Sequence, residues 1–253
     1  MIPSHPDSRA VAGARPGADG YDVVIVGGRV AGASTALLLA RCGHRVLVVE
    51  RGSEGSDTVS THTLLRLGVL QLQRWGVLER LVEAGTPPIR KVTLGFGPEL
   101  VPIEISEDYG VDALYAPRRT LLDQTLVDAA REAGVEFVHG ARMTDLVRDS
   151  GGRVRGVVLG GETVVPARFV VGADGVWSRT AKLVDAVEDP AHPASSSVYY
   201  AYYQGVDTDG VYFQFTPGVS AGLIPTNGDE VCVYVGWPLD QIAGFRSDPE
   251  AAF

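Results

Sequence analysis

Hydrophobic residues form two short uninterrupted runs near the start of the chain, at 23–26 and 46–49, with small and aliphatic residues between them. Such runs are typical of strands buried on both faces of a parallel sheet. Residues 30–42 fit a buried helix that ends at Gly43. The pattern therefore predicts a strand–helix–strand unit over 21–51, which is how an α/β fold begins.

The middle of the chain combines helical periodicity with short strand-like runs. Apolar residues at i+3 and i+4 spacing predict helices over 61–84 and 118–133. Strands are predicted at 91–96, 100–105, 112–116, 135–138 and 169–171, the last of them buried. A β-meander is expected over 142–166, with turns at the glycine pairs 151–152 and 160–161.

In the last quarter of the chain the composition shifts toward tyrosine and phenylalanine, in alternating runs that extend to Trp237. This pattern predicts a second, mainly antiparallel sheet. Tyr200 and Tyr202 share one face of their strand, and Tyr199 and Tyr203 share the other. Either pair is ordinary sheet core or the aromatic wall of a substrate pocket.

Composition and charge narrow the class of protein. The formal net charge of -9 argues against nucleic-acid binding, and no apolar run is long enough for stable membrane insertion. Residues 1–20 are rich in Pro, Gly, Ala and Asp and lack the apolar core of a signal peptide, so a disordered tail is expected there. Cys42 and Cys232 are expected to be small core residues, and this sparing use of cysteine fits the cytoplasm.

A glycine-rich turn lies between the first strand and the first helix, and an acidic residue ends the second strand. The turn contains Gly27, Gly28, Ala31 and Gly32, and the acid is Glu50. A dinucleotide pyrophosphate needs backbone N–H groups at a helix N-terminus with no side chain in the way, and its ribose needs an acid about 20 positions later. The pattern therefore predicts a site for an adenine dinucleotide whose ribose carries no phosphate.

Arg29 occupies the middle glycine position of this fingerprint, where the backbone approaches the pyrophosphate most closely. Two interpretations remain open at this point. The side chain either turns away as a surface arginine or directs its guanidinium to a phosphate.

Two further motifs accompany the turn. Asp174 and Gly175 follow a strand, and Arg119 opens a helix three residues before Leu122. Together with residues 22–51, these motifs resemble the class A flavoprotein monooxygenases of the para-hydroxybenzoate hydroxylase fold. That family is itself similar to the geranylgeranyl reductases and the flavin halogenases.

The resemblance implies an α/β fold in which a Rossmann-like FAD-binding domain is interleaved with a substrate domain. The first domain, a βαβ unit with a parallel sheet plus the β-meander, is expected over 21–89 and 117–190. The second domain, the mainly antiparallel sheet, is expected over 90–116 and 191–253.

The resemblance also implies which residues hold FAD. The spacing to Leu122 favours Arg119 over Arg118, which is then a solvated cation at the helix start. The expected cofactor-binding residues are Gly27, Gly28, Arg29, Ala31, Gly32, Glu50, Arg51, Arg119, Asp174 and Gly175.

The chemistry that the resemblance implies belongs mostly to the cofactor. NAD(P)H reduces the flavin, molecular oxygen adds as a C4a-hydroperoxide, and the distal oxygen goes to an electron-rich small molecule. We therefore expect an FAD-dependent monooxygenase that hydroxylates an aromatic, polyketide or isoprenoid-like compound. One alternative is a prenyl-chain reductase of the same fold. Another is a truncated, non-catalytic FAD-binding module, because the family's C-terminal glycine–aspartate motif has no counterpart before Phe253.

His62 is the candidate catalytic residue. It lies in the loop after the Glu50 strand, where relatives place residues near the flavin, and an imidazole there can relay a proton. In the alternative interpretation Ser60 or Thr61 caps the following helix, and His62 lies on its exposed first turn. No spacing of histidine, cysteine or acidic residues in the sequence suggests a metal site.

Overall fold

The computed structural model of the protein describes residues 20–60, 63–187 and 195–241. Its contacts divide the chain into two compact units, each assembled from two separate stretches of sequence. The described residues of unit 1 fall within Met1–Thr58 and Arg119–Glu188, and those of unit 2 within Val59–Arg118 and Asp189–Phe253. The interleaving expected from the sequence is therefore observed.

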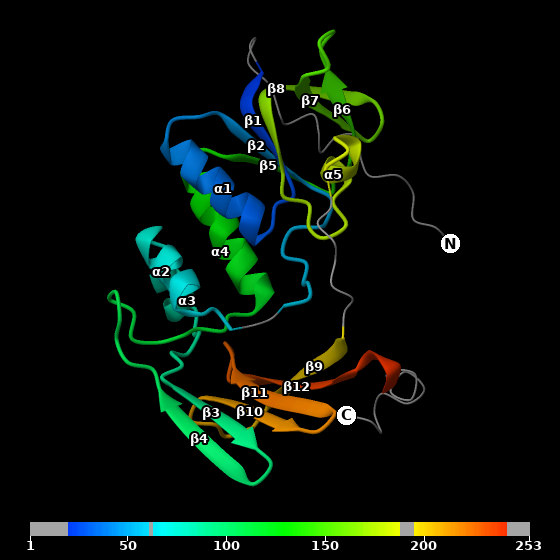
Figure 1. The fold of residues 1–253 in the computed structure, drawn as a ribbon. Coiled ribbons are helices and arrows are strands. Elements are labelled where there is room, and N and C mark those ends of the chain that lie inside the picture. The colour runs from blue at the N-terminus through cyan, green and yellow to red at the C-terminus, as the bar shows by residue number, and fades with distance from the viewer. Residues whose placement is uncertain (1–19, 61–62, 188–194, 242–253) are drawn as a thin grey trace. The chain divides into compact units, whose positions relative to one another are not determined.

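The elements of each unit are drawn in Figure 1. Unit 1 contains β1 (Tyr21–Val26), α1 (Val30–Arg41), β2 (Val46–Glu50), α4 (Arg119–Glu132), β5 (Glu136–His139), β6 (Met143–Arg148), β7 (Val154–Leu159), β8 (Thr163–Gly172) and α5 (Arg179–Leu183). Unit 2 contains α2 (Arg66–Arg74), α3 (Leu78–Glu83), β3 (Lys91–Phe96), β4 (Glu99–Glu104), β9 (Ser196–Gln204), β10 (Val211–Thr216), β11 (Val219–Pro225), β12 (Glu230–Pro238) and the 3-10 turn η2 (Leu239–Gln241).

The sheet of unit 1 has the strand order β5-β2-β1-β8-β7-β6. β1 pairs in parallel with β2 and β8, and β2 pairs in parallel with β5, whereas β6, β7 and the first half of β8 form an antiparallel meander. Val24, Ile25, Leu47 and Val48 are completely buried, as the uninterrupted apolar runs predict. α1 and α4 pack against each other (Figure 1). The predicted βαβ unit and meander are both confirmed.

The strand predicted at 169–171 is the second half of β8, so it continues the last strand of the meander. Pro166 still pairs with the antiparallel β7, and Ala167 already pairs with the parallel β1. The expectation that this strand is buried is wrong, because Phe169 is 57% exposed, with the guanidinium of Arg153 5.6 Å from its ring centroid. A short apolar run indicates a strand without indicating whether both of its faces are covered.

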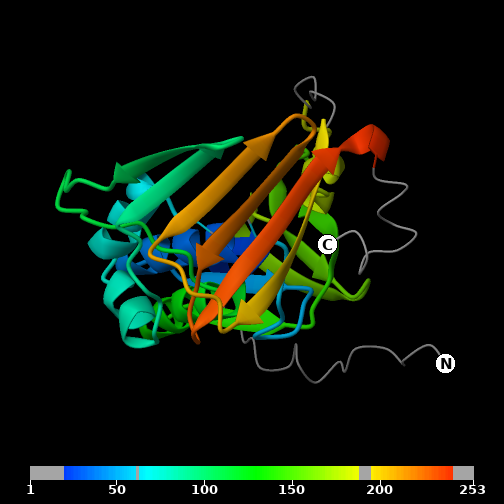
Figure 2. The same cartoon turned by 90° about the horizontal axis from the view of Figure 1, so that it is seen from below.

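The sheet of unit 2 has the strand order β4-β3-β10-β11-β12-β9, and Figure 2 shows its strands side by side. Every pair in it is antiparallel except β3 with β10. The prediction of a mainly antiparallel second sheet is confirmed. Tyr200 and Tyr202 pack on a buried cluster that includes Ile224 and Cys232, which favours the core interpretation for this pair.

The single helix predicted over 61–84 is two short helices, α2 and α3. Gly76 lies between them with φ +67, a left-handed conformation typical of the residue that ends a helix. Residues 61–62 lie outside the described residues, and Leu64 forms an isolated bridge with Tyr115 ahead of α2. The strand predicted at 112–116 is reduced to such isolated bridges.

The structure groups the segment 59–89 with unit 2, whereas the sequence places it in the first domain. The reason is apolar packing. Val69 and Leu70 of α2 lie in one buried cluster with Val111, Ala113 and other residues of unit 2. Contacts between segments about 40 residues apart leave no local signal in the sequence.

The two cysteines differ in burial. Cys232 is buried, but Cys42 is exposed because it caps the C-terminus of α1, so the expectation of two core cysteines is half wrong.

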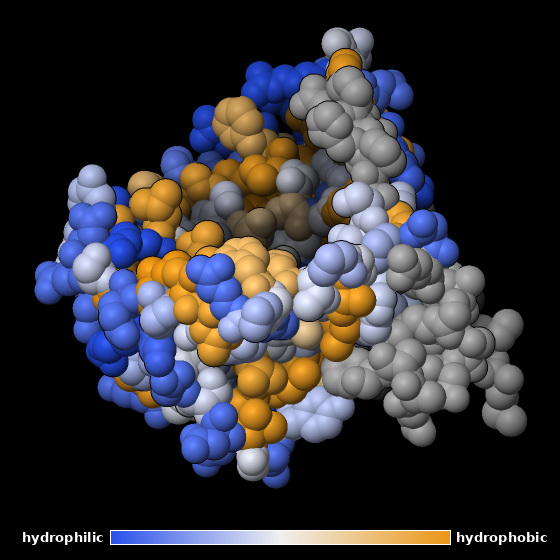
Figure 3. Space-filling model, turned by 60° about the horizontal axis from the view of Figure 1, so that its bottom comes forward, coloured by the Kyte–Doolittle hydropathy of each residue, from blue (hydrophilic) through white to orange (hydrophobic). Residues whose placement is uncertain are grey.

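Figure 3 shows hydrophobic side chains reaching the surface among hydrophilic ones. The exposed hydrophobic residues of the second sheet include Phe96, Leu100 and Phe215. Within the described ranges, no helix combines the length and the apolar character needed to cross a membrane.

Candidate cofactor site

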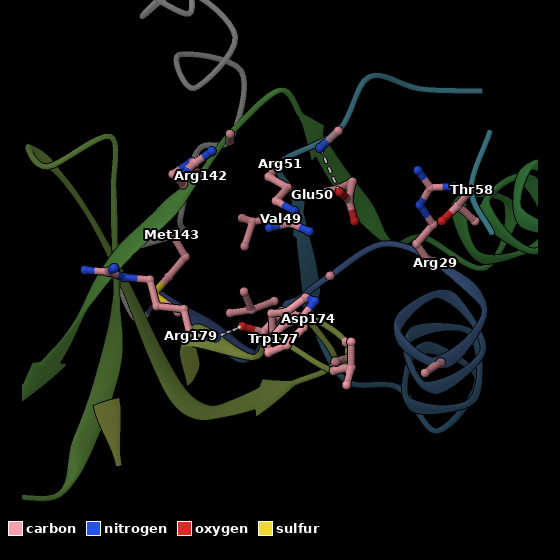
Figure 4. Close-up of a pocket in the computed structure, with 18 of the residues that line it drawn as sticks. Arg29, Val49, Glu50, Arg51, Thr58, Arg142, Met143, Asp174, Trp177 and Arg179 are labelled. Carbon is pink, nitrogen blue, oxygen red and sulfur yellow. Dashed lines mark hydrogen bonds between the residues drawn. The ribbon is translucent and has the colours of Figure 1, made fainter. Parts of the chain in front are cut away.

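A cleft of about 690 Å³ lies within unit 1, at the carboxyl ends of β1, β2 and β8. Open α/β sheets bind their ligands at this edge, and the volume is in the usual range for cofactor pockets. The lining comes from the turn after β1, the end of β2, the start of β6 and the loop after β8. Figure 4 shows side chains from these segments converging on the cleft.

The glycine turn packs so tightly that two of its positions exclude any side chain. Gly27 has φ +104, and a Cβ there would lie 2.3 Å from the carbonyl oxygen of Ala173. A Cβ on Gly32 would lie 1.8 Å from the carbonyl oxygen of Gly27. The turn therefore packs closely against the loop after β8 and the first turn of α1, and its residues Gly27 and Arg29 line the cleft.

Glu50 ties this turn to the next loop. Its carboxylate is 9% exposed and accepts two backbone hydrogen bonds, at Oε2 from the N–H of Gly28 and at Oε1 from the N–H of Gly52, both at 2.7 Å. Figure 4 shows one of these two bonds as a dashed line at Glu50. Each oxygen keeps a lone pair with which it can accept a ribose hydroxyl. Gly28 and Gly32 are not among the lining residues of the cleft, whereas Gly27, Ala31 and Glu50 are.

The side chain of Arg29 does not turn out to the surface, which was the first of the two interpretations, and a contact with a phosphate stays a prediction. The backbone of Arg29 is extended (φ -83, ψ -168), so an L-residue fits here without strain. Nη1 donates to the carbonyl oxygen of Ser56 at 2.8 Å and to Oδ2 of Asp123 at 3.0 Å, and Nη2 donates to Ser56 Oγ at 3.0 Å. The guanidinium is thus bound to α4 and to the loop after β2.

Arg119 also lines the cleft and binds the same carboxylate. Its Nε and Nη2 donate to Oδ1 of Asp123 at 3.1 and 3.0 Å. Arg118 belongs to unit 2, where it pairs with Glu230 at 2.6 Å and lies 3.5 Å from the ring centroid of Tyr202. The choice of Arg119 for the cleft agrees with its position, and the expectation of a solvated Arg118 is wrong.

Asp174 lines the cleft, but its carboxylate is bound by its own loop. Oδ1 accepts from Ser178 Oγ at 2.6 Å, and Oδ2 accepts from the backbone N–H groups of Arg179 and Thr180 at 2.8 and 3.0 Å. Burial opposes ionisation of Asp174, but the hydrogen bonds from Ser178 and Thr180 outweigh it and lower the pKa. Asp174 therefore shapes the loop that presents Gly175, which also lines the cleft.

The sequence motifs did not indicate several of the side chains that line the cleft. Trp177 and Arg179 lie just beyond Asp174 and Gly175 in the same loop, so that motif could have indicated them. Arg142 and Met143, at the start of β6, line the cleft because the preceding segment is bonded to the end of β2, where the N–H of Ala141 donates to the carbonyl oxygen of Glu50 at 3.0 Å. Contacts so far apart along the chain leave no local signal in the sequence.

The lining is basic although the whole chain has a net charge of -9. Its acidic residues are Glu50 and Asp174, and both carboxylates accept hydrogen bonds from the backbone. Its basic residues are Arg29, Arg51, Arg119, Arg142, Arg179 and Lys182. A glycine backbone at a helix N-terminus, surrounded by cations, fits the two negative charges of a pyrophosphate. The residues present therefore fit FAD.

His62, the candidate catalytic residue, and Thr61 lie outside the described residues. Ser60 does not cap a helix, because α2 begins at Arg66 with Leu65 as its N-cap. The backbone N–H of Ser60 instead donates to the hydroxyl of Tyr200 at 3.3 Å. Among the described residues, no cluster of three or more His, Cys, Asp or Glu could hold a metal ion.

Residues 20–250 match the family model described as FAD binding domain. 6-Methylpretetramide 4-monooxygenase of Streptomyces rimosus is 32% identical, with 94% of this chain and 58% of that protein covered. Digeranylgeranylglycerophospholipid reductase 1 of Methanococcoides burtonii is 28% identical, with coverages of 86% and 54%. The chain thus spans about half the length of these relatives.

Solved structures share this fold. Pseudomonas aeruginosa PqsL, in complex with 2-aminobenzoylacetate, superposes with a TM-score of 0.80 at 22% identity, covering 90% of this chain and 64% of that one. The myxobacterial chondrochloren halogenase CndH gives a TM-score of 0.79 at 22% identity, with coverages of 92% and 56%. At such identities the likeness concerns the fold alone.

Proposed function

Because this chain belongs to the FAD binding domain family, we propose that it holds FAD in the cleft of unit 1 and serves an NAD(P)H-using monooxygenase reaction on a small molecule. The observation that carries the proposal is the glycine turn, which leaves no room for a Cβ at Gly27 or Gly32 and lies beneath a basic lining. Such a turn binds a pyrophosphate through backbone N–H groups.

In this proposal, different residues of the cleft bind different parts of FAD. Gly27, Arg29 and the N-terminus of α1 bind the pyrophosphate, and Glu50 binds the adenosine ribose. Arg51 and Arg119 add positive charge. The loop at Asp174 and Gly175 takes the ribityl side. FAD supplies the redox chemistry when bound; the chain binds it, orients it and restricts water.

The aromatic side chains of unit 2 favour the proposal that the substrate is planar. The rings of Phe96 and Phe215 lie 5.6 Å apart and both side chains are exposed, whereas the neighbouring Phe213 and Tyr234 pack on the buried cluster beneath Tyr200 and Tyr202. The exposed pair offers stacking partners to an aromatic or polyketide compound. The Streptomyces relative, whose name states a monooxygenase acting on 6-methylpretetramide, supports the same class.

A reductase acting on prenyl chains is the second candidate. It is favoured by the relative from Methanococcoides burtonii, which aligns with 86% of this chain. The two candidates differ in where the reducing equivalents go, since only a monooxygenase consumes molecular oxygen as a substrate.

The FAD-reconstituted chain tests both candidates when it is given NADH or NADPH in an oxygen electrode. We expect oxidation of the nicotinamide to be accompanied by oxygen uptake, and a polycyclic aromatic compound to accelerate both. Nicotinamide oxidation that proceeds equally under nitrogen in the presence of a prenyl lipid would support the reductase. Bound FAD that no nicotinamide reduces would contradict both enzymes and leave a cofactor-binding module.

A further inference from the structure

One wall of the cleft is formed by residues 51–58, the loop that follows β2, called the β2 loop from here on. Its first residues, Arg51 and Gly52, and its last, Thr58, line the cleft. The loop contains neither helix nor strand, and within it the backbone forms one hydrogen bond, from the N–H of Ser56 to the carbonyl oxygen of Ser53 at 3.3 Å. Its position therefore depends on attachments to the rest of unit 1.

Arg29 provides one such attachment. The guanidinium donates to the carbonyl oxygen of Ser56 at 2.8 Å and to its hydroxyl at 3.0 Å, in the middle of the β2 loop. The same group donates to Asp123 of α4 at 3.0 Å. One planar fork therefore joins the start of α1, the β2 loop and α4, a combination that the compact ammonium of lysine cannot reproduce.

Asp123 is a rigid anchor for this fork. It is 8% exposed, and its carboxylate also accepts three hydrogen bonds from Arg119. A buried carboxylate that accepts hydrogen bonds from two guanidinium groups is held in one orientation, because both of its oxygens are engaged. Ser56 is additionally fixed by its own loop, since its hydroxyl donates to the carbonyl oxygen of Ser53 at 2.7 Å.

We propose that Arg29 is a positioning residue that fastens the β2 loop to α4 and so holds this wall of the cleft in its binding shape before FAD enters. The inference rests on the proposed binding of FAD. Glycine at this position leaves room for the pyrophosphate but has no side chain with which to hold the loop. Here the loop is held by the arginine, whose donors are directed to Ser56 and Asp123 and whose backbone is unstrained.

The proposal predicts that Arg29→Gly, which restores the fingerprint glycine, weakens FAD binding. Arg29→Ala is the cleaner variant, because alanine suits the extended backbone and adds no flexibility. We expect both variants to raise the FAD dissociation constant about tenfold, the scale of losing hydrogen bonds to a charged group. Ordering a loop on binding costs affinity that a preformed loop retains.

The first measurement is amide hydrogen exchange in the FAD-free protein. We expect residues 52–58 to exchange about tenfold faster in Arg29→Ala and Arg29→Lys than in the wild type. Arg45→Ala is the matched control. It removes another unit 1 arginine with a backbone contact, to the carbonyl oxygen of Gly20 at 2.9 Å, outside the cleft. Unchanged exchange of the loop in Arg29→Ala overturns the proposal.

The second measurement is FAD affinity by fluorescence titration at two salt concentrations. Positioning predicts the same salt dependence in the wild type and Arg29→Ala, and weakened binding in Arg29→Lys although the charge is kept. Retained affinity in Arg29→Lys with a shallower salt dependence in Arg29→Ala would establish a phosphate contact instead and overturn the proposal. If the wild type binds no FAD, the proposed function fails, whereas the exchange data alone decide whether Arg29 fastens the loop.

A milder variant guards against a general folding defect. Ser56→Ala removes one of the contacts to Arg29 and keeps the carbonyl contact. We expect faster exchange confined to the β2 loop and an intermediate FAD dissociation constant. Wild-type exchange and affinity in Ser56→Ala, together with global acceleration of exchange in Arg29→Ala, would assign Arg29 a purely structural role.

Discussion

At the scale of single residues, the cleft depends on side chains that bind each other before any ligand is considered. Arg29 and Arg119 share Asp123, Glu50 holds two backbone N–H groups, and Asp174 holds its own loop. Most of the cofactor-binding residues predicted from the sequence line the cleft, because the spacing of residues within each motif indicates them. The sequence did not predict their partners, because Asp123 lies 94 residues from Arg29.

Replacing Asp123 by Asn tests how much the shared carboxylate contributes. We expect Asp123→Asn to lower the free energy of unfolding by about 1–3 kcal/mol, because two guanidinium groups lose a charged partner in a largely buried position. Asp209→Asn is the matched control, since Asp209 pairs with Lys91 with its own side chain 76% exposed, and solvent screens such a pair, so its loss should have a smaller effect. Urea denaturation measures both variants, and equal effects would contradict this account of Asp123.

At the scale of elements, the glycine turn packs against the first turn of α1, and side-chain hydrogen bonds join the β2 loop to α4. Strands and the first helix were predicted well because their burial is continuous and local. The division of 61–84 into α2 and α3 was missed, because leucine spacing continues across Gly76 although the backbone there is left-handed. The path of the β2 loop was also missed, since side chains far along the chain fix it.

Substitution of two helix glycines, one tightly packed and one not, distinguishes the effect of packing on stability from the effect of helix propensity. In Gly32→Ala the new Cβ would lie 1.8 Å from a backbone oxygen, so we expect loss of about 2 kcal/mol or more in the free energy of unfolding. In Gly68→Ala of α2 the nearest atom is 3.8 Å away, so we expect a gain of about 0.5–1 kcal/mol. Thermal unfolding compares them, and a neutral Gly32→Ala would refute the tight packing of the turn.

The contacts of Glu54 with α4 are a second attachment of the β2 loop, and we expect their contribution to stability to decrease at low pH. Glu54 binds Arg131 of α4, with Nη2 to Oε2 at 3.0 Å, and accepts from Gln124 at 3.0 Å. The hydrogen bonds from Arg131, and then from Gln124, lower the pKa of Glu54 from 4.5 to about 2. A lowered pKa in the folded state means that the stabilisation is complete above about pH 4.5 and is lost as pH falls toward 2.

We therefore expect the wild type to be more stable than Glu54→Gln at pH 6, and the difference to shrink as the pH falls below 4.5. Urea denaturation at pH 6, 4.5 and 3.5 measures it. Glu99→Gln, on the exposed strand β4, controls for the loss of a surface carboxylate. A difference that grows as the pH falls would contradict the assigned direction of the pKa shift.

At the scale of the whole chain, two units are each assembled from two stretches of sequence, and the cleft belongs entirely to one of them. The fold class and the interleaving could be predicted, because each sheet has its own hydrophobic pattern. The boundary near residue 59 could not, because it depends on apolar contacts between α2 and the segment around Val111. The chain belongs to the FAD binding domain family over nearly its full length.

The most direct test of this account is an FAD titration of the purified wild-type chain beside Gly32→Ala and Gly68→Ala, with bound flavin measured by absorbance after gel filtration. We predict about one FAD per chain in the wild type and in Gly68→Ala, because a single turn binds one pyrophosphate. Gly32→Ala should retain little or none, since its new Cβ meets the backbone of the turn. Absence of FAD from the wild type, or full retention by Gly32→Ala, would contradict the central claim that this glycine turn holds the cofactor.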